Sequence, residues 1–273
     1  VVHAFGLRVL RRLMIATAGS GRPRIVLSMT GRERLTWLDR RLLRPVARVL
    51  VPHAHAVDAL TRQGVPAAQI IQVPPAVAEA PPPPDRDTFL RAHDLPPDAT
   101  LIVTAGRMDT RLRLFDALWA FEILRYGDST CHLLLVGDGP GRAGMELAAA
   151  ELAPEGTRAR FLGARPDVPA LLGLADVVHV PNREGGVNVA LEAMAASRTV
   201  VVAETPELSA IVRHGDTGFL IRPGDRTATV KLLWQFLRDP AERAPIGAAA
   251  ARAARERHQI STLVPMMEAV YGE

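Results

Sequence analysis

Short aliphatic runs alternate with longer stretches of helical periodicity along most of this 273-residue chain. The aliphatic runs predict strands over Ile25–Met29, Arg48–Val51, Ile70–Val73, Leu101–Ala105, His132–Val136, Arg160–Leu162, Val177–Val180 and Thr199–Val202. Apolar residues at helical spacing predict helices near 32–44, 53–63, 112–125, 141–151, 187–196, 226–238 and 241–256. Strands that alternate with helices are typical of βαβ units, so we expect an α/β fold with parallel sheets.

One stretch interrupts the alternation, AEAPPPPDRD at residues 78–87. Four successive prolines cannot continue a helix or a central strand, so an extended, semi-rigid linker is expected there. The linker predicts a first domain over residues 1–80, which has too few strands for a complete doubly wound sheet, and a larger domain over 81–256. The chain starts VVHAFG, without Met or a signal peptide, which indicates a piece of a longer protein that lacks its extreme N-terminus.

Composition narrows the class of protein further. Hydrophobic residues make up 48% of the chain, enough for a sizeable core, but no apolar run approaches the roughly 18–20 residues of a membrane span. Cys131 is the only cysteine, which excludes an intramolecular disulfide and a zinc site built from several cysteines. A cytoplasmic setting is therefore expected.

The positive charge of the chain is almost entirely arginine. There are 33 basic and 29 acidic residues, a net charge of +4, and Lys231 is the only lysine. The basic segment 32–44 could meet acidic lipid headgroups at the inner face of a membrane, although a solvated helix face is its more ordinary interpretation. Nucleic-acid binding has little support, with 4% aromatic residues and no recognisable module.

The strongest candidate for a ligand site is NREGGVNVALEAMAA at residues 182–196, which follows the predicted strand Val177–Val180. Gly185 and Gly186 would let backbone N–H groups approach a ligand at the start of a helix, where the dipole favours phosphate. Glu184 and Glu192 flank this turn, and Glu192 lies among apolar helix residues, where carboxylates are usually partnered or functional. The pattern predicts a site for a phosphorylated, hydroxyl-rich ligand.

A second candidate is Gly106-Arg107, directly after the predicted strand 101–105. Ligands in open α/β sheets bind beyond the carboxyl ends of the strands, and arginine there can present its guanidinium group to a phosphate. Arg111 and Arg113 follow within reach of the same loop.

Three other constellations are better explained without a ligand. Gly139, Gly141 and Gly144 have Gly-x-Gly-x-x-Gly spacing, but the next strand ends in FLGAR without the acidic residue that a dinucleotide site needs, so they indicate a turn with Pro140 at a helix start. The triplet 85–87 (Asp-Arg-Asp) mimics a metal-binding pair, but it lies in the predicted linker and is expected to be solvated charge. His53 and His55 would point to different sides of a helix, which argues against a metal site.

Several of these segments together resemble retaining glycosyltransferases of family 4, over about residues 45–272. The resemblance is carried by TAGRMD (104–109), LLLVGDGPGR (133–142), FLGARPDVPALLGLADVVHVPNREGGVNVALEAMAA (161–196) and TGFLIRPGD (217–225). It implies the GT-B architecture, two Rossmann-like domains that face each other across a cleft, with the first domain incomplete here. It also implies that residues 257–273 form a C-terminal helix that crosses back to the first domain.

The resemblance assigns roles to matching residues. Glu184 would contact the hydroxyls of the transferred sugar and Glu192 the ribose of a nucleotide-diphosphate sugar, which is the donor substrate and the only small molecule implied. Arg107 would stabilise the departing diphosphate, a task done without a metal ion. The remaining donor-binding residues implied are Gly185, Gly186, Val187, Asn188, Gly106, Arg113, Ala164 and Arg165, the last two beside the base.

Two departures from the family pattern leave the activity open. Leu112 stands where the family usually has a lysine, so Arg111 or Arg113 must substitute, and Thr30, in SMTG (28–31), replaces a histidine implicated in the reaction. PHAH (52–55) and VPPAV (73–77) also differ from the family. The leading hypothesis is a retaining, metal-independent glycosyltransferase for an unidentified glycan, lipid or small-molecule acceptor. The alternatives are a catalytically silent nucleotide-sugar-binding relative and a sugar-nucleotide epimerase. A pyridoxal-phosphate phosphorylase is disfavoured, because Lys231 is far from these motifs.

Overall fold

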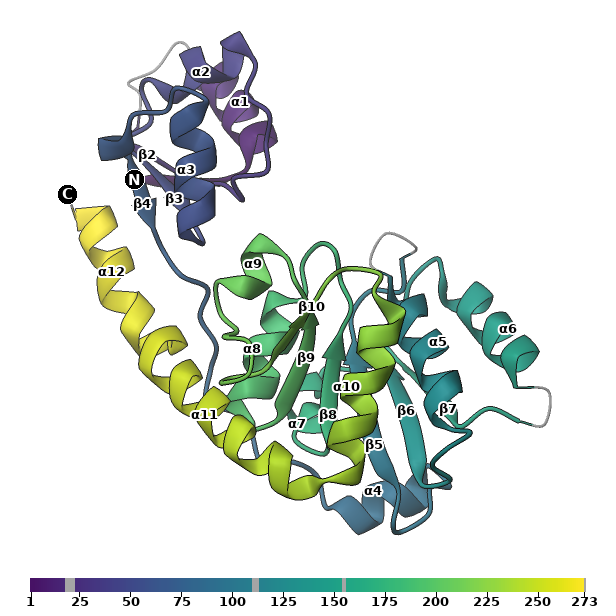
Figure 1. The fold of residues 1–273 in the computed structure, drawn as a ribbon. Helices are drawn as coiled ribbons and strands as arrows, with labels where there is room; N and C mark the ends of the chain where they lie inside the picture. Colours follow the sequence, from purple (N-terminus) through teal and green to yellow (C-terminus); the bar gives the residue numbers. More distant parts are fainter. Residues whose placement is uncertain (18–22, 110–112, 154–155, 273) are drawn as a thin grey trace. The chain divides into compact units, whose positions relative to one another are not determined.

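The computed structural model describes residues 1–17, 23–109, 113–153 and 156–272. They form two compact units (Figure 1). The first unit contains Val1–Ala76 and Ile260–Glu273, and the second contains Val77–Gln259. The division falls a few residues before the proline stretch, and residues 257–259 group with the second unit. Both units alternate parallel strands with helices, which confirms the predicted α/β class.

The first unit is built on a four-stranded parallel sheet in the order β1-β2-β3-β4. Its elements are β1 (Val2–Phe5), α1 (Leu7–Ala16), β2 (Ile25–Ser28), α2 (Trp37–Leu43), β3 (Arg48–Val51), α3 (Ala54–Arg62), a 3-10 turn η1 (Ala67–Gln69), β4 (Ile70–Gln72) and α12 (Ile260–Gly272). Leu10, Leu27, Val49 and Leu60 belong to its core. On α12, Val270 packs with Val26 and Leu50 of the sheet.

Helix α2 is shorter than the helix predicted over 32–44. It begins at Trp37 because Thr36 forms a capping box with Asp39: the Asp39 N–H donates to Thr36 Oγ1 at 3.2 Å, and the Thr36 N–H donates to Asp39 Oδ2 at 3.0 Å. The buried Asp39 carboxylate also accepts from Arg11 of α1 at 2.7 Å, which ties the two helices together.

The second unit is built on a six-stranded parallel sheet in the order β10-β9-β8-β5-β6-β7. Its strands are β5 (Thr100–Ala105), β6 (Cys131–Val136), β7 (Ala159–Gly163), β8 (Val177–Val180), β9 (Thr199–Ala203) and β10 (Phe219–Ile221). Its helices are α4 (Arg86–Ala92), α5 (Leu114–Leu124), α6 (Arg142–Leu152), α7 (Val168–Leu172), α8 (Val187–Ala195), α9 (Pro206–Ser209), α10 (Arg226–Arg238) and α11 (Pro240–His258).

Helices cover both faces of this sheet (Figure 1). On one face α8 and α11 contribute Leu191, Met194 and Ala250 to a core with Val103 and Val178. On the other face α5 and α10 contribute their own buried side chains, including Leu118, Phe121 and Phe236. The strand order runs outward from β5 in both directions, which is the doubly wound arrangement.

The extended linker predicted over residues 78–87 ends earlier in the structure, because α4 begins at Arg86. Asp85 is the N-cap of α4, and its carboxylate accepts from the Thr88 N–H at 2.9 Å. Arg86 donates to the carbonyl oxygens of Leu174 and Ala99, each at 2.7 Å. The prediction that 85–87 is only solvated charge is therefore wrong, because Arg86 crosslinks the start of α4 to the sheet.

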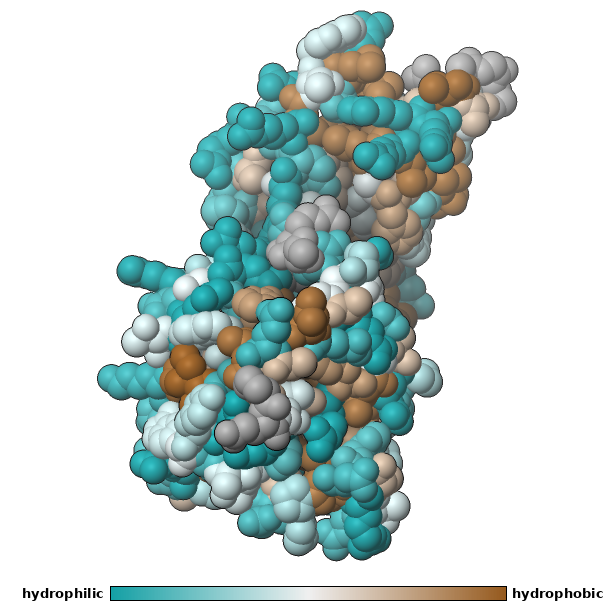
Figure 2. All heavy atoms as spheres, turned by 90° about the vertical axis from the view of Figure 1, so that its right-hand side faces the viewer, coloured by the Kyte–Doolittle hydropathy of each residue, from teal (hydrophilic) through white to brown (hydrophobic). Residues whose placement is uncertain are grey.

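The elements that the sequence pattern missed are short, except α1. They are β1, α1, α4, α7, α9 and β10. No helix in the described ranges is long and apolar enough to cross a membrane. On the face in Figure 2, hydrophilic side chains surround scattered hydrophobic ones, which is an ordinary mixture for a protein surface.

Candidate functional site

The candidate site lies where the second sheet changes direction, at the carboxyl ends of β5 and β8. The chain leaves these two neighbouring strands toward opposite edges of the sheet, the topological switch point at which open α/β sheets bind ligands. The β5–β8 pairing covers Ile102 with Val177 and Val103 with Val178. Beyond that pairing, the Thr104 hydroxyl donates to the His179 carbonyl oxygen at 3.1 Å. The loops that begin at Gly106 and at Pro181 therefore start side by side.

The loop after β5 is fixed by the loop after β6. The Met108 N–H donates to the Asp138 carbonyl oxygen at 2.9 Å, and the Gly141 N–H donates to the Met108 carbonyl oxygen at 2.8 Å. A Cβ atom at Gly137 would lie 1.9 Å from the Gly106 carbonyl oxygen, so only glycine fits there. Gly137 and Gly139 therefore allow two loops to pack closely, and α6 starts at Arg142 rather than at Pro140.

The loop after β8 turns on two glycines with left-handed backbone, Gly185 at φ 72° and Gly186 at φ 80°. Gly186 is the N-cap of α8 and makes no side-chain cap, so the first-turn N–H groups, which include those of Val187 and Asn188, remain available to a ligand. A Cβ atom at Gly186 would lie 2.6 Å from Val180 Cγ1, whereas one at Gly185 would meet nothing within 4 Å. Gly186 is therefore required for the close packing of the turn against Val180, whereas the space beside Gly185 is open.

Asn182 links the two loops, and the sequence analysis did not single it out. Its side chain is buried, and its Nδ2 lies 3.9 Å from the position of a Cβ atom at Gly106. On its other side, its Cβ lies 3.3 Å from the position of a Cβ atom at Gly186. Among the described residues, Asn182 Oδ1 has no hydrogen-bond partner. The sequence signal that could have identified Asn182 is its position, as a polar residue directly after the apolar run of β8.

The two predicted glutamates differ in environment. Glu184 is exposed on the turn, beside Gly185, whereas Glu192 is half-buried on α8 between the buried Leu191 and Ala193. Burial raises the pKa of the Glu192 carboxyl group. Within the described ranges no hydrogen bond or ion pair compensates the Glu192 carboxylate, which suits a group that accepts hydrogen bonds from ligand hydroxyls.

The two described arginines near this edge differ in whether a carboxylate already binds them. Arg107 is exposed at the carboxyl end of β5. Arg113, by contrast, is the N-cap of α5 with φ 59°, and its guanidinium group forms an ion pair with Asp116. Asp116 also pairs with Arg226 at 3.3 Å. Arg113 Nη2 lies 3.2 Å from the position of a Cβ atom at Gly224, so its side chain extends toward the loop after β10. Arg111 and Leu112 lie outside the described residues.

The predicted base-binding pair follows β7. The Gly163 carbonyl oxygen accepts from the Gly137 N–H at 2.7 Å, which brings the end of β7 against the loop after β6. Ala164 is exposed there. Arg165 forms two hydrogen bonds of 2.9 Å with Asp167, so its guanidinium group is already oriented by a neighbour.

A buried histidine lies beneath this edge, and the sequence analysis did not predict it as part of the site. His179 on β8 lines a cavity of about 20 Å³ with Asp116, Arg226 and Thr229. Burial lowers the pKa of His179 to about 4, so its ring is neutral at pH 7. The cavity is large enough for one water molecule, which could bridge these polar groups.

The sequence was compared with known protein families and with curated proteins. The model of the family described as "Glycosyl transferases group 1" matches residues 85–253. N-acetyl-alpha-D-glucosaminyl L-malate synthase of Bacillus anthracis is 31% identical over 161 residues, which are 58% of this chain and 42% of that protein. D-inositol 3-phosphate glycosyltransferase of Salinispora tropica is 33% identical over 200 residues, 67% of this chain and 40% of that protein. The chain thus spans less than half the length of these curated relatives.

Solved structures share the fold. Anabaena HepE, crystallised with UDP and glucose, superposes with a TM-score of 0.85 and is 19% identical over 99% of this chain and 78% of its own. A sucrose-phosphate synthase from Thermosynechococcus elongatus has a TM-score of 0.80 and 21% identity, over 98% of this chain and 72% of that one. Both are GT-B structures, which confirms the predicted fold class.

Proposed function

Because this chain belongs to the group 1 glycosyl transferases, we propose that the protein transfers a sugar from a nucleotide-diphosphate sugar to an acceptor, with retention of configuration and without a metal ion. The observation that carries the proposal is the juxtaposition at one sheet edge of the Gly106-Arg107 loop and the Glu184–Glu192 turn. The solved relative with UDP and glucose makes a UDP-sugar the first donor to test.

The chemistry of the site supports a division of labour along the donor. The diphosphate lies over the first turn of α8, where uncapped N–H groups and the helix dipole favour negative charge. Arg107 is exposed beside it and stabilises the charge that grows on the diphosphate as the sugar leaves. Glu184 binds hydroxyls of the transferred sugar, and Glu192 binds the ribose hydroxyls.

We expect the base of the nucleotide to bind near the end of β7, where the family resemblance implies Ala164 and Arg165. Ala164 leaves space at the edge, and Arg165 is held in place by Asp167. The site must also hold donor and acceptor at reacting distance. Such positioning alone can contribute much of the rate acceleration.

A catalytically silent nucleotide-sugar-binding protein is the second candidate, and Thr30 favours it. A threonine hydroxyl cannot take over the proton chemistry of the histidine that the family resemblance implies at this position. The candidates share the donor site and differ only in turnover.

Titration with a panel of nucleotide-diphosphate sugars tests the donor site, followed by product analysis with and without acceptors. We expect binding of one donor, weakened at least tenfold by Glu192→Ala. Undiminished binding in Glu192→Ala would reject the site. Transfer or slow donor hydrolysis that disappears in Glu184→Ala would favour the transferase over the silent protein. Binding without either reaction would favour the silent protein.

A further inference from the structure

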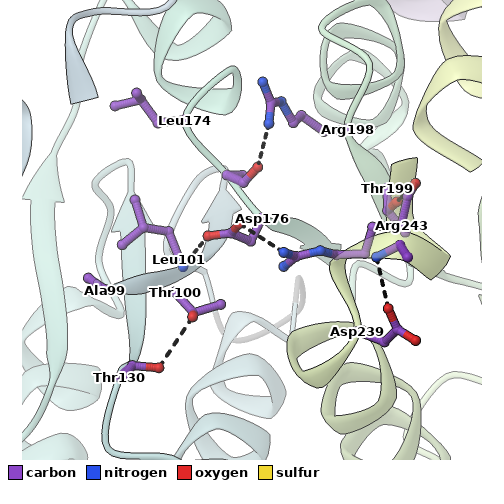
Figure 3. Close-up of polar contacts among 12 residues, drawn as sticks. Ala99, Thr100, Leu101, Thr130, Leu174, Asp176, Arg198, Thr199, Asp239 and Arg243 are labelled. Carbon is purple, nitrogen blue, oxygen red and sulfur yellow. Dashed lines mark hydrogen bonds and ion pairs between the residues drawn. The ribbon is translucent and has the colours of Figure 1, made fainter. Parts of the chain in front are cut away.

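A second polar cluster lies at the other edge of the same sheet, where β5 and β8 begin (Figure 3). Asp176 directly precedes β8 and lies among arginines from three different elements, of which Figure 3 labels Arg198 and Arg243. Arg86 comes from α4, Arg198 from the turn after α8, and Arg243 from the first turn of α11. This arginine cluster is separate from the donor site, because Thr100–Ala105 of β5 runs between the two edges.

The Asp176 carboxylate contacts two of the three arginines, Arg86 and Arg243. Asp176 Oδ2 accepts from the Leu101 N–H at 2.8 Å and from Arg86 Nη2 at 3.2 Å, and Asp176 Oδ1 pairs with Arg243 Nη2 at 3.3 Å. The Arg198 side chain donates from its Nη1 to the Ala175 carbonyl oxygen at 3.3 Å, and among the described residues it has no carboxylate partner. Figure 3 shows Arg243 extending toward Asp176, whereas the guanidinium group of Arg198 reaches the Ala175 carbonyl oxygen.

The positive charge of the cluster is not balanced. Three guanidinium groups face one carboxylate, and the nearby Asp239 carboxylate caps α11 by accepting from the Ala241 N–H at 2.8 Å. Arg198 Nε and Arg243 Nη1 are buried and have no hydrogen-bond partner among the described residues. Burial lowers the pKa of Arg198, and the charge of Asp176 opposes this effect while the positive charges of Arg86 and Arg243 add to it. An arginine cluster of this kind is stabilised by an additional anion.

The surface above the cluster is hollowed. A cavity of about 340 Å³ is lined by Asp176, by the polar Ser197, Arg198, Thr199 and Arg243, and by the start of α11. Its rim includes Ala244, which is exposed. The Ser197 hydroxyl beside the guanidinium groups of Arg198 and Arg243 forms a donor set suited to a tetrahedral oxyanion.

We propose that this hollow binds a phosphate group, at a site separate from the donor site. Free phosphate or a phosphate ester would place its oxygens between Arg198 and Arg243, near the Ser197 hydroxyl. Asp176 stays in place as the group that orients the arginines. The ligand thus supplies the negative charge that Asp176 alone does not.

A negative charge introduced at Ala244, on the rim of the hollow, tests the proposal without removing the contacts of Asp176 with Arg86 and Arg243. Ala244→Asp adds a negative charge on the exposed side of the first turns of α11, whereas Ala244→Asn adds a side chain of the same size without charge. Inorganic phosphate is titrated into the full chain at constant ionic strength, with binding measured by equilibrium dialysis and by the midpoint of thermal unfolding. We expect Ala244→Asp to weaken phosphate binding by roughly tenfold or more and Ala244→Asn by less than about threefold.

Three further variants separate this site from other phosphate sites. Arg107→Gln removes the proposed phosphate contact at the donor site and should leave this binding unchanged, while Arg243→Gln should abolish it. Arg252→Gln, on the exposed side of α11, is the matched control and should bind as the wild type does. Sedimentation with vesicles of anionic phospholipid then tests a lipid headgroup as the source: binding that is lost in Ala244→Asp but kept in Ala244→Asn assigns the site to headgroups. Absence of binding to both probes, or equal binding by Ala244→Asp and Ala244→Asn, overturns the proposal.

Discussion

The Thr104 hydroxyl donates a hydrogen bond of 3.1 Å to the backbone carbonyl oxygen of His179. This bond takes over where the β5–β8 backbone pairing ends, at Val103 and Val178. A side chain can bridge the widening gap between strands that a backbone ladder cannot. The contact therefore holds β5 and β8 together at the point where their loops separate to form the proposed donor site.

Thr104→Val should destabilise the second unit, because it leaves the buried His179 carbonyl oxygen without this donor. We expect the free energy of unfolding to fall by about 1–2 kcal/mol and the dissociation constant for the donor to rise. Thr100→Val is the control, since the Thr100 hydroxyl contacts Thr130 at 3.3 Å at the other end of β5. Urea unfolding and donor titration measure both effects. Equal effects of the two substitutions on donor binding would contradict this role of Thr104.

Two adjacent glycines allow a matched test of the turn before α8. Gly185→Ala places a Cβ in open space and should cost about 1–2 kcal/mol, from the left-handed backbone alone. Gly186→Ala has the same backbone cost and also brings its Cβ to 2.6 Å from Val180 Cγ1, so a further 1–3 kcal/mol or so is expected. Thermal and urea unfolding measure the difference. If the two variants were equally stable, the close packing at Gly186 would not matter for the fold.

The sequence predicted the parts of the site that depend on strand ends. In a parallel sheet every strand ends at the same edge, so Gly106 and Gly185 could be assigned to one edge from the strand pattern, whereas Ala164 was implied only by the family resemblance. The pattern located every strand except β1 and β10, but it did not show which strands are neighbours in the sheet. For this reason the contact of Asn182 with Gly106 could not be predicted, since it depends on β8 lying next to β5.

Side-chain pairing was harder to predict than backbone position. Arg86 and Arg113 both looked like solvent-facing arginines, one in a linker and one available to a ligand. The structure pairs Arg113 with Asp116 and Arg86 with Asp176, which is 90 residues away. A long-range pair such as Arg86–Asp176 leaves no periodic signal in the sequence. Short elements such as β10 and α9 were missed for a related reason, because three or four residues cannot show a period.

Glu192 should lower the stability of the ligand-free protein at neutral pH. Its pKa is raised by burial, so between the unfolded and the folded pKa the folded state holds the proton more tightly. The free energy of unfolding therefore decreases as pH rises through that window, and it stays lower at pH 7. We expect Glu192→Gln to be more stable than the wild type at neutral pH without donor, and to bind the donor more weakly.

Unfolding of Glu192→Gln as a function of pH, with and without donor, checks both parts. The advantage of the variant should disappear well below pH 4, where the wild-type carboxyl group is protonated in both states. Glu256→Gln, an exposed change on α11, should show neither effect. A Glu192→Gln variant that is less stable than the wild type at pH 7 would show that the carboxylate has a stabilising partner.

His179 should make the second unit sensitive to acid. Its folded pKa is about 4, whereas an unfolded histidine titrates near 6.5, so between these values the unfolded state binds more protons. The free energy of unfolding should then fall as pH decreases, by up to about 1.4 kcal/mol for each pH unit and by up to roughly 3 kcal/mol in total. His179→Leu keeps the volume and cannot be protonated, so its stability should depend less on pH over this range. His55→Gln is the control, because His55 is exposed on α3. Urea unfolding at pH values from 4 to 8 gives the slopes, and equal slopes for wild type and His179→Leu would mean that the buried ring is not the group that titrates.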